Sequence, residues 1–205
     1  FKIMALKVLP FLLRLGSHIC GIKEKILILV ATSGDTGKAA LEGFKDAEGI
    51  KIMVFYPDDG VSKMQKLQMC TQEGSNVNVV AVKGNFDDCQ TAVKQIFSDE
   101  EYAKTLKERG YILSSANSIN FGRLAPQIAY YFSAYLDLVS GGQIEMGEGV
   151  DFSVPTGNFG NILAAYYAKR MGLPVRRLHC ASNMNKILTD FFKTGVYDKR
   201  RKFYI

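Results

Sequence analysis

The sequence lacks paired cysteines and any long apolar run. Its 205 residues include only two histidines and four cysteines, at positions 20, 70, 89 and 180, without a C-x-x-C spacing. This set supports neither a zinc site nor a disulfide framework, so we expect no metal and a reducing, cytoplasmic setting. The longest apolar run, 26–32, is far shorter than the ~20 residues that span a bilayer, which argues against a membrane protein.

The sequence also lacks a nucleic-acid-binding motif, although its charge is mildly basic. It has 26 basic and 20 acidic side chains, a net charge of +6 and 47% hydrophobic residues. The hydrophobic content excludes wholesale disorder. Part of the basic excess forms one run at 199–202, which we interpret as solvated, because basic residues bind nucleic acid mainly as a patch on a folded face. We therefore expect neither a nucleic-acid nor a membrane partner.

Short apolar segments alternate with longer amphipathic ones along the whole chain. Strands separated by helices of about 10–15 residues are typical of βαβ units with a parallel sheet. The sequence therefore predicts an α/β fold. The predicted strands lie at 26–30, 51–56, 77–82, 111–114, 151–154 and 175–181. The predicted helices lie at 1–15, 35–45, 62–73, 87–97, 99–109, 123–139, 161–171 and 185–193.

The first candidate site is the turn Ala-Thr-Ser-Gly-Asp-Thr-Gly at 31–37, directly after the first predicted strand. Ligands of open α/β sheets bind beyond the carboxyl ends of the strands. Glycines allow tight backbone geometry here, and the amides of a helix N-terminus attract an anion. The turn matches neither the Walker loop nor G-x-G-x-x-G. The alternative is a plain turn in which Ser33 or Asp35 caps the helix.

Two further segments combine small polar residues with a helix start. Pro-Thr-Gly-Asn-Phe-Gly-Asn at 155–161 forms an amide-rich turn that suits a phosphate group, or else a tight turn with an asparagine cap. The segment 114–123 ends in Arg123, whose charge opposes the helix dipole in the first turn. Arg123 could therefore bind a phosphate with two hydrogen bonds, or it could be an ordinary surface arginine.

Together these three motifs resemble threonine synthase, a fold-type-II pyridoxal-phosphate enzyme. The resemblance covers essentially the whole chain, and the motifs ATSGDTG, NSINFGR and PTGNFGN occur in the family's order. The opening Phe1-Lys2 aligns with the family's cofactor-lysine segment, where Ile3 replaces the usual aspartate. The resemblance implies three-layer α/β/α lobes of the tryptophan synthase β-like kind, incomplete here. It further implies that the chain is a central fragment lacking N- and C-terminal portions.

The resemblance implies a carbon–oxygen lyase that converts O-phospho-L-homoserine and water into L-threonine and phosphate. Lys2 would be the catalytic residue, binding pyridoxal 5'-phosphate through its amine and moving protons at the substrate carbons. The other cofactor-binding residues would be Asp35, Gly157, Asn158, Phe159, Gly160 and Asn161. The residues that bind the substrate would be Ser33, Gly34, Thr36, Asn117, Ser118 and Arg123. Lys63 is a further candidate for an anion contact, although a solvated helix lysine is the simpler interpretation.

The resemblance also implies a domain division and leaves other functions open. Residues 22–120 would form a small α/β domain that carries the SGDTG turn, and 1–21 with 121–205 would be part of a large cofactor-binding domain. The chain by itself is expected to show weak or no turnover. The alternatives are another fold-type-II enzyme, such as a serine or threonine dehydratase or a cysteine synthase, and a non-catalytic homologue that binds a phosphorylated ligand. The oligomeric state does not follow from the sequence.

Overall fold

The chain forms two compact units, Phe1–Arg123 and Leu124–Ile205. The computed structural model describes residues 2–32, 34–118, 120–157, 159–198 and 200. Each unit is an α/β assembly with its own sheet and its own buried core.

The first unit begins with a helix and then alternates strands and helices. Its elements are α1 (Lys2–Ile19), β1 (Lys25–Ala31), α2 (Asp35–Phe44), β2 (Ile50–Pro57), α3 (Lys63–Cys70), β3 (Val77–Val82), α4 (Phe86–Ser98), α5 (Glu100–Glu108) and β4 (Tyr111–Ser115). The four strands form one sheet in the order β3-β2-β1-β4, and every neighbouring pair is parallel. The central strand β1 therefore directs its carboxyl end, and the SGDTG turn that follows it, to one edge of the sheet.

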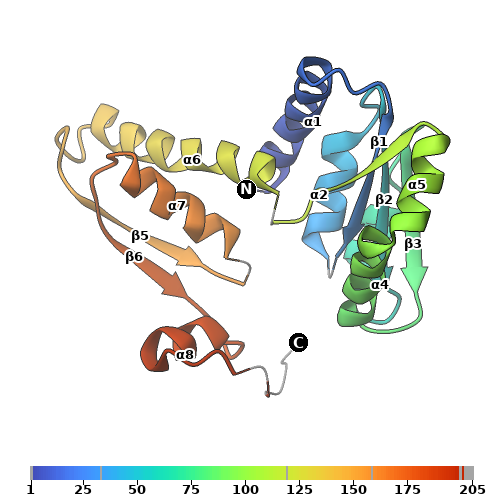
Figure 1. Ribbon diagram of the computed structural model, residues 1–205. Helices are drawn as coiled ribbons and strands as arrows, with labels where there is room; N and C mark the ends of the chain where they lie inside the picture. The colour runs from blue at the N-terminus through green and yellow to red at the C-terminus, as the bar shows by residue number, and fades with distance from the viewer. Residues whose placement is uncertain (1, 33, 119, 158, 199, 201–205) are drawn as a thin grey trace. The chain divides into compact units, whose positions relative to one another are not determined.

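Helices cover both faces of this sheet, which makes the first unit three-layered (Figure 1). Alternate residues of β1 point to opposite faces, as the strand period of two requires. Ile28 and Val30 pack in the cluster that contains residues of α1, α2 and α3, whereas Leu29 packs with Cys89 and Val93 of α4. Both faces of β1 are buried, and this explains why its sequence is continuously apolar.

Helix α1 packs closely on α2, and this contact sets the position of Lys2. Leu6 and Leu9 are buried in the same cluster as Phe44. The two backbones approach at Gly43, where an added Cβ would lie only 2.5 Å from the Leu6 carbonyl oxygen. A side chain at position 43 would therefore push α1, and the lysine at its start, away from α2.

The second unit contains most of a long helix and a two-stranded parallel sheet. Helix α6 (Phe121–Ser140) begins at the end of the first unit, and β5 (Val150–Pro155), α7 (Gly160–Arg170), β6 (Val175–Ala181) and α8 (Ile187–Thr194) follow. Strands β5 and β6 pair in parallel, and Figure 1 shows α7 between them in the chain as a βαβ unit. The core combines residues of α6, α7 and both strands, among them Tyr131, Val154 and Ala165.

The predicted α/β class is confirmed, and a helix or strand is present at every predicted segment. Helix α1 belongs to the first unit in this chain, because Leu6 and Leu9 are part of its core. The expected assignment of 1–21 and 121–205 to one large domain concerns the longer protein and stays a prediction. Within the described part of the chain, no helix has the length and apolar character needed to cross a membrane.

Candidate active site

Lys2 is the first residue of α1, and its side chain is half-buried. Burial is the largest influence on the amine and lowers its pKa, because a charged group loses hydration when it is buried. The carboxylate of Asp35 acts in the opposite direction, and the guanidinium of Arg123 lowers the pKa of Lys2 further. The net result is an amine that loses its proton more easily than a solvated lysine does.

The SGDTG turn is organised by a buried threonine that precedes it. Thr32 is 2% exposed, and its Oγ1 accepts hydrogen bonds from the amides of Gly34 and Gly37, each at 3.0 Å. The same hydroxyl donates to the Gly34 carbonyl at 3.1 Å. One side chain thereby closes the turn between β1 and α2.

The N-cap of α2 is Gly34, which has no side chain to offer as a cap. The alternative in which Asp35 caps the helix is therefore wrong, since Asp35 is the first residue inside it. Its exposed carboxylate instead accepts a hydrogen bond from Gln65 Nε2 at 2.8 Å. Thr36 follows, half-buried, in the first turn, and Ser33 lies outside the described residues.

Gln65 also contacts this turn, although none of the sequence motifs includes it. It lies in the first turn of α3 and forms a capping box with Ser62, in which each side chain bonds the backbone amide of the other. The pattern Ser-x-x-Gln in the sequence could have indicated the cap. It could not have indicated the contact with Asp35, which lies 30 residues away.

Arg123 is deeply buried rather than on the surface. The residue is 4% exposed, and its Nη1 donates to the carbonyl of Ala116 at 2.8 Å. Burial lowers the pKa of Arg123, and its charge acts on Lys2. The surface-arginine alternative is therefore wrong. Asn117 and Ser118 are half-buried in the loop that precedes α6.

The loop that carries Arg123 is fixed by its own polar side chains. Asn120 donates through Nδ2 to the carbonyl of Ser115 at 2.6 Å, and its Oδ1 accepts from the Gly122 amide at 2.9 Å. The Asn117 amide donates to Ser115 Oγ at 3.1 Å. These bonds connect the end of β4 to the first turn of α6. They thereby fix the start of the helix that carries Arg123.

The PTGNFGN turn lies in the second unit, between β5 and α7. Thr156 is buried and donates to the Val154 carbonyl at 2.7 Å, and its amide donates to Ala181 on β6 at 2.8 Å. The Asn161 carbonyl accepts from the hydroxyl of Tyr131 at 2.8 Å, and Asn161 Nδ2 donates to the Pro155 carbonyl at 3.0 Å. Asn158 lies outside the described residues.

This turn has the properties of an anion cup. Helix α7 begins at Gly160, and its N-cap is Phe159, which among the described residues makes no capping hydrogen bond through its side chain. An added Cβ at Gly157 would meet no described atom within 4 Å, so the space beside this backbone is open. Open backbone amides at a helix N-terminus suit a phosphate group. The alternative of an asparagine N-cap is wrong, since Phe159 occupies that position.

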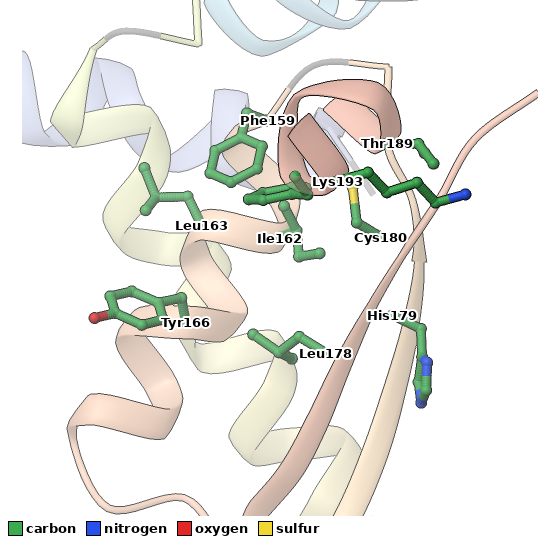
Figure 2. A pocket seen from close by; sticks show the side chains of 10 residues that line it. Phe159, Ile162, Leu163, Tyr166, Leu178, His179, Cys180, Thr189 and Lys193 are labelled. Carbon is green, nitrogen blue, oxygen red and sulfur yellow. The ribbon is translucent and has the colours of Figure 1, made fainter. Parts of the chain in front are cut away.

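A separate apolar cavity of about 690 Å³ opens between α7, β6 and α8 in the second unit (Figure 2). Its walls include Ile162, Leu163, Tyr166 and Leu178. Phe159 is the one expected site residue among those that line it. The described residues contain no cluster of histidine, cysteine or carboxylate side chains that could bind a metal.

Within the first unit, Asp35 and Arg123 both act electrostatically on the Lys2 amine, although the three residues are far apart in the sequence. Lys63 is exposed at the start of α3. Gly157, Phe159, Gly160 and Asn161 belong to the second unit.

Comparison with known proteins agrees with these motifs. A family model described as "Pyridoxal-phosphate dependent enzyme" matches residues 1–203. Threonine synthase-like 1 of Homo sapiens is 51% identical over 208 residues, which cover 98% of this chain and 28% of that protein. Threonine synthase of Pseudomonas aeruginosa is 44% identical over 200 residues, covering 97% of this chain and 40% of that protein.

A solved structure shows the same likeness in three dimensions. The PLP-bound threonine synthase of Brucella melitensis is 41% identical with a TM-score of 0.85, and the match covers 100% of this chain and 41% of that one. The chain therefore spans less than half the length of each of these three relatives.

Proposed function

The chain belongs to the pyridoxal-phosphate dependent enzyme family, and on that premise we propose that the protein containing it is a threonine synthase. The proposed reaction converts O-phospho-L-homoserine and water into L-threonine and phosphate. The similarity to threonine synthases and to threonine synthase-like proteins over nearly the whole chain supports the proposal.

The residues present fit the cofactor. An amine whose pKa is lowered by burial, as that of Lys2 is, reacts readily with an aldehyde, because the neutral form is the nucleophile. The open backbone at Gly157 and the start of α7 at Gly160 would bind the cofactor phosphate through their amides. Asn158, Phe159 and Asn161 would complete that cup. When bound, pyridoxal phosphate supplies an aldehyde and a ring that stores the electron pair of a carbanion.

Each of the chain's own site residues would then have a distinct role. Lys2 would bind the cofactor covalently and move protons at the substrate carbons. Asp35 would orient the cofactor ring and supply negative charge beside the Lys2 amine. Gly34, Thr36 and Ser33 would contact the substrate carboxylate. Asn117, Ser118 and Arg123 would bind the substrate phosphate.

The single observation that carries the choice of substrate is the buried Arg123. Burying a guanidinium is costly in free energy, and an anionic ligand offsets this cost through charge-assisted hydrogen bonds. A phosphate ester is such a ligand, whereas the substrates of a serine or threonine dehydratase or a cysteine synthase carry no phosphate. The Arg123 guanidinium also acts on the Lys2 amine. It therefore favours a phosphorylated amino acid as the substrate.

The test is a substrate panel on the purified full-length protein. We expect release of phosphate and formation of L-threonine from O-phospho-L-homoserine, and little turnover of L-serine or L-threonine. Arg123→Met should lower kcat/KM for phosphohomoserine at least about 100-fold, and Arg123→Lys should restore only part of it. Turnover of unphosphorylated amino acids alone, unchanged by Arg123→Met, would favour a dehydratase instead.

Lys2 has its own chemical test. Borohydride should fix pyridoxal phosphate on Lys2, and mass spectrometry of the digested protein should find the label on that peptide. Lys2→Ala should abolish the label. A label on another lysine would reject the assignment.

A non-catalytic binder of phosphorylated amino acids is the second candidate. Ile3 favours it, because an apolar side chain packs on the core where the family carries an aspartate next to the lysine. Cofactor and phosphohomoserine binding without phosphate release would support this candidate. If the Ile3→Asp variant then released phosphate, position 3 would be identified as the cause of the missing turnover.

A further inference from the structure

Gln65 connects the start of α3 to the SGDTG turn. Its Nε2 donates to Asp35 Oδ1 at 2.8 Å, and its Oε1 accepts from the Ser62 amide at 3.2 Å. One end of the amide is therefore used by the cap of α3, and the other by the carboxylate at the start of α2. With both ends bonded, the amide is restricted to one orientation.

The backbone of Gly34 lies against the same amide. A Cβ built on Gly34 would lie 2.5 Å from Gln65 Nε2 and 2.9 Å from Oε1, distances that real Cβ atoms do not adopt. Gly34 also has a φ of 149°, a conformation that favours glycine. The absence of a side chain at position 34 thus leaves the space that Gln65 occupies.

The contact matters because of what Asp35 does. Two charged groups act on the Lys2 amine among the described residues, the Asp35 carboxylate from α2 and the Arg123 guanidinium from α6. Burial lowers the pKa of Lys2, Asp35 raises it, and Arg123 lowers it. Asp35 is exposed, so without a partner its carboxylate would exchange between rotamers and spend time in solvent.

We propose that Gln65 is a positioning residue that holds the Asp35 carboxylate where it acts on Lys2. The proposal rests on the proposed function only in giving Lys2 a catalytic role. Among the described residues Gln65 makes no hydrogen bond to Lys2, and by this proposal it does not bind the substrate. It acts through one hydrogen bond to Asp35.

The first experiment measures Lys2 without using turnover. Trace acetylation of the full-length protein, freed of cofactor, is followed by peptide mass spectrometry from about pH 6 to about pH 10, which reports the neutral fraction of each lysine. Gln65→Met removes the donor, weakens the action of Asp35, and should make Lys2 react about two- to threefold faster near neutral pH. Asp35→Ala should have the same effect. In the Asp35→Ala background, Gln65→Met should add nothing.

Three outcomes of this experiment would overturn the proposal. One is a Lys2 labelling rate unchanged or slowed by Gln65→Met. The second is an equal acceleration by Gln65→Met in the Asp35→Ala background, which would show that Gln65 acts independently of Asp35. The third is a rate that Asp35→Ala leaves unchanged. Gln68→Met is the matched control, since Gln68 is an exposed glutamine on the same helix, and it should leave the rate at the wild-type value.

The second experiment separates positioning from capping. Gln65→Glu keeps the acceptor that Ser62 needs, because glutamate is equally suited to a capping box, but it cannot donate to Asp35. The new carboxylate would also repel Asp35 from its position, so we expect a kcat about tenfold lower for phosphohomoserine. Full kcat in this variant would show that the cap is the only role of Gln65. If the wild-type protein has no turnover, the proposed function fails, while the acetylation series still decides the role of Gln65.

Discussion

At the scale of single residues, the hydroxyl of Thr32 makes three hydrogen bonds that hold the SGDTG turn. It accepts from two amides of the SGDTG turn and donates to one carbonyl, all within the buried interior. A turn rich in glycine has many accessible backbone conformations, so a fixed side-chain partner is needed to select one. The conformation of the predicted site therefore depends on a threonine that was not among its expected ligand-binding residues.

Replacement of Thr32 tests this dependence. Thr32→Val keeps the shape of the side chain but leaves the Gly34 amide without its acceptor, and we expect a loss of about 2–3 kcal/mol in the free energy of unfolding. Thr32→Ser keeps the hydroxyl and should cost about 1 kcal/mol, through its missing methyl group. Urea denaturation of both variants measures the difference. A loss in Thr32→Ser with none in Thr32→Val would assign the effect to packing rather than to the hydrogen bonds.

Tyr131 gives a pH-dependent prediction in the second unit. Burial raises its pKa from the ordinary 10.0 to about 12, and its hydroxyl donates to the Asn161 carbonyl of the PTGNFGN turn. Because the pKa is higher in the folded state, the stabilisation is fully present below about pH 10 and is lost as the pH rises through about 12.

Tyr131→Phe removes this titration. Between about pH 9 and about pH 11 the wild-type protein should lose about 1 kcal/mol more stability than the variant, since all other tyrosines are common to both. Urea unfolding at the two pH values gives the comparison. Parallel losses in both proteins would show that Tyr131 titrates normally.

At the scale of elements, the decisive contact is the close approach of α1 and α2. The two helices meet where Gly43 faces the backbone of Leu6, and this packing anchors the helix that begins with Lys2. The position of Lys2, the proposed catalytic lysine, therefore depends on a glycine of another helix. A backbone contact of this kind cannot be relieved by rotating a side chain.

Two glycine substitutions distinguish this contact from helix propensity. Gly43→Ala should destabilise the protein by about 1–3 kcal/mol, because the new Cβ would lie 2.5 Å from the Leu6 carbonyl oxygen, despite the better helix propensity of alanine. Gly16→Ala in α1 is the control: no described atom lies within 4 Å of its Cβ, so it should stabilise by up to about 1 kcal/mol. Thermal unfolding measures both. A stabilising Gly43→Ala would mean that α1 can shift without cost.

At the scale of the whole molecule, the chain covers 28% to 41% of the relatives reported above. The residues expected to bind the cofactor lie in two separate units, with Lys2 in one and the PTGNFGN turn in the other. A productive site requires both groups to face the same ligand. We therefore propose that further parts of the protein contribute to activity.

This proposal is tested by comparing the 205-residue chain with the full-length protein. The chain alone should release phosphate from O-phospho-L-homoserine at a rate at least about 100-fold below that of the full-length protein, because misplaced catalytic groups lose the benefit of orientation. A coupled phosphate assay on both proteins measures the ratio. Equal rates would show that the two units are sufficient by themselves.

The sequence by itself determined the elements and the identity of the motifs. Continuous apolar runs such as 26–30 predicted buried parallel strands, and the turns after them predicted the candidate site, because these patterns depend only on neighbouring residues. The tertiary structure decided which residues from other segments surround them. The burial of Arg123, the bond from Gln65 to Asp35 and the action of both charges on Lys2 join segments separated by entire strands. Local patterns do not encode such contacts, since they arise only when parallel strands bring their carboxyl ends to one edge of a sheet.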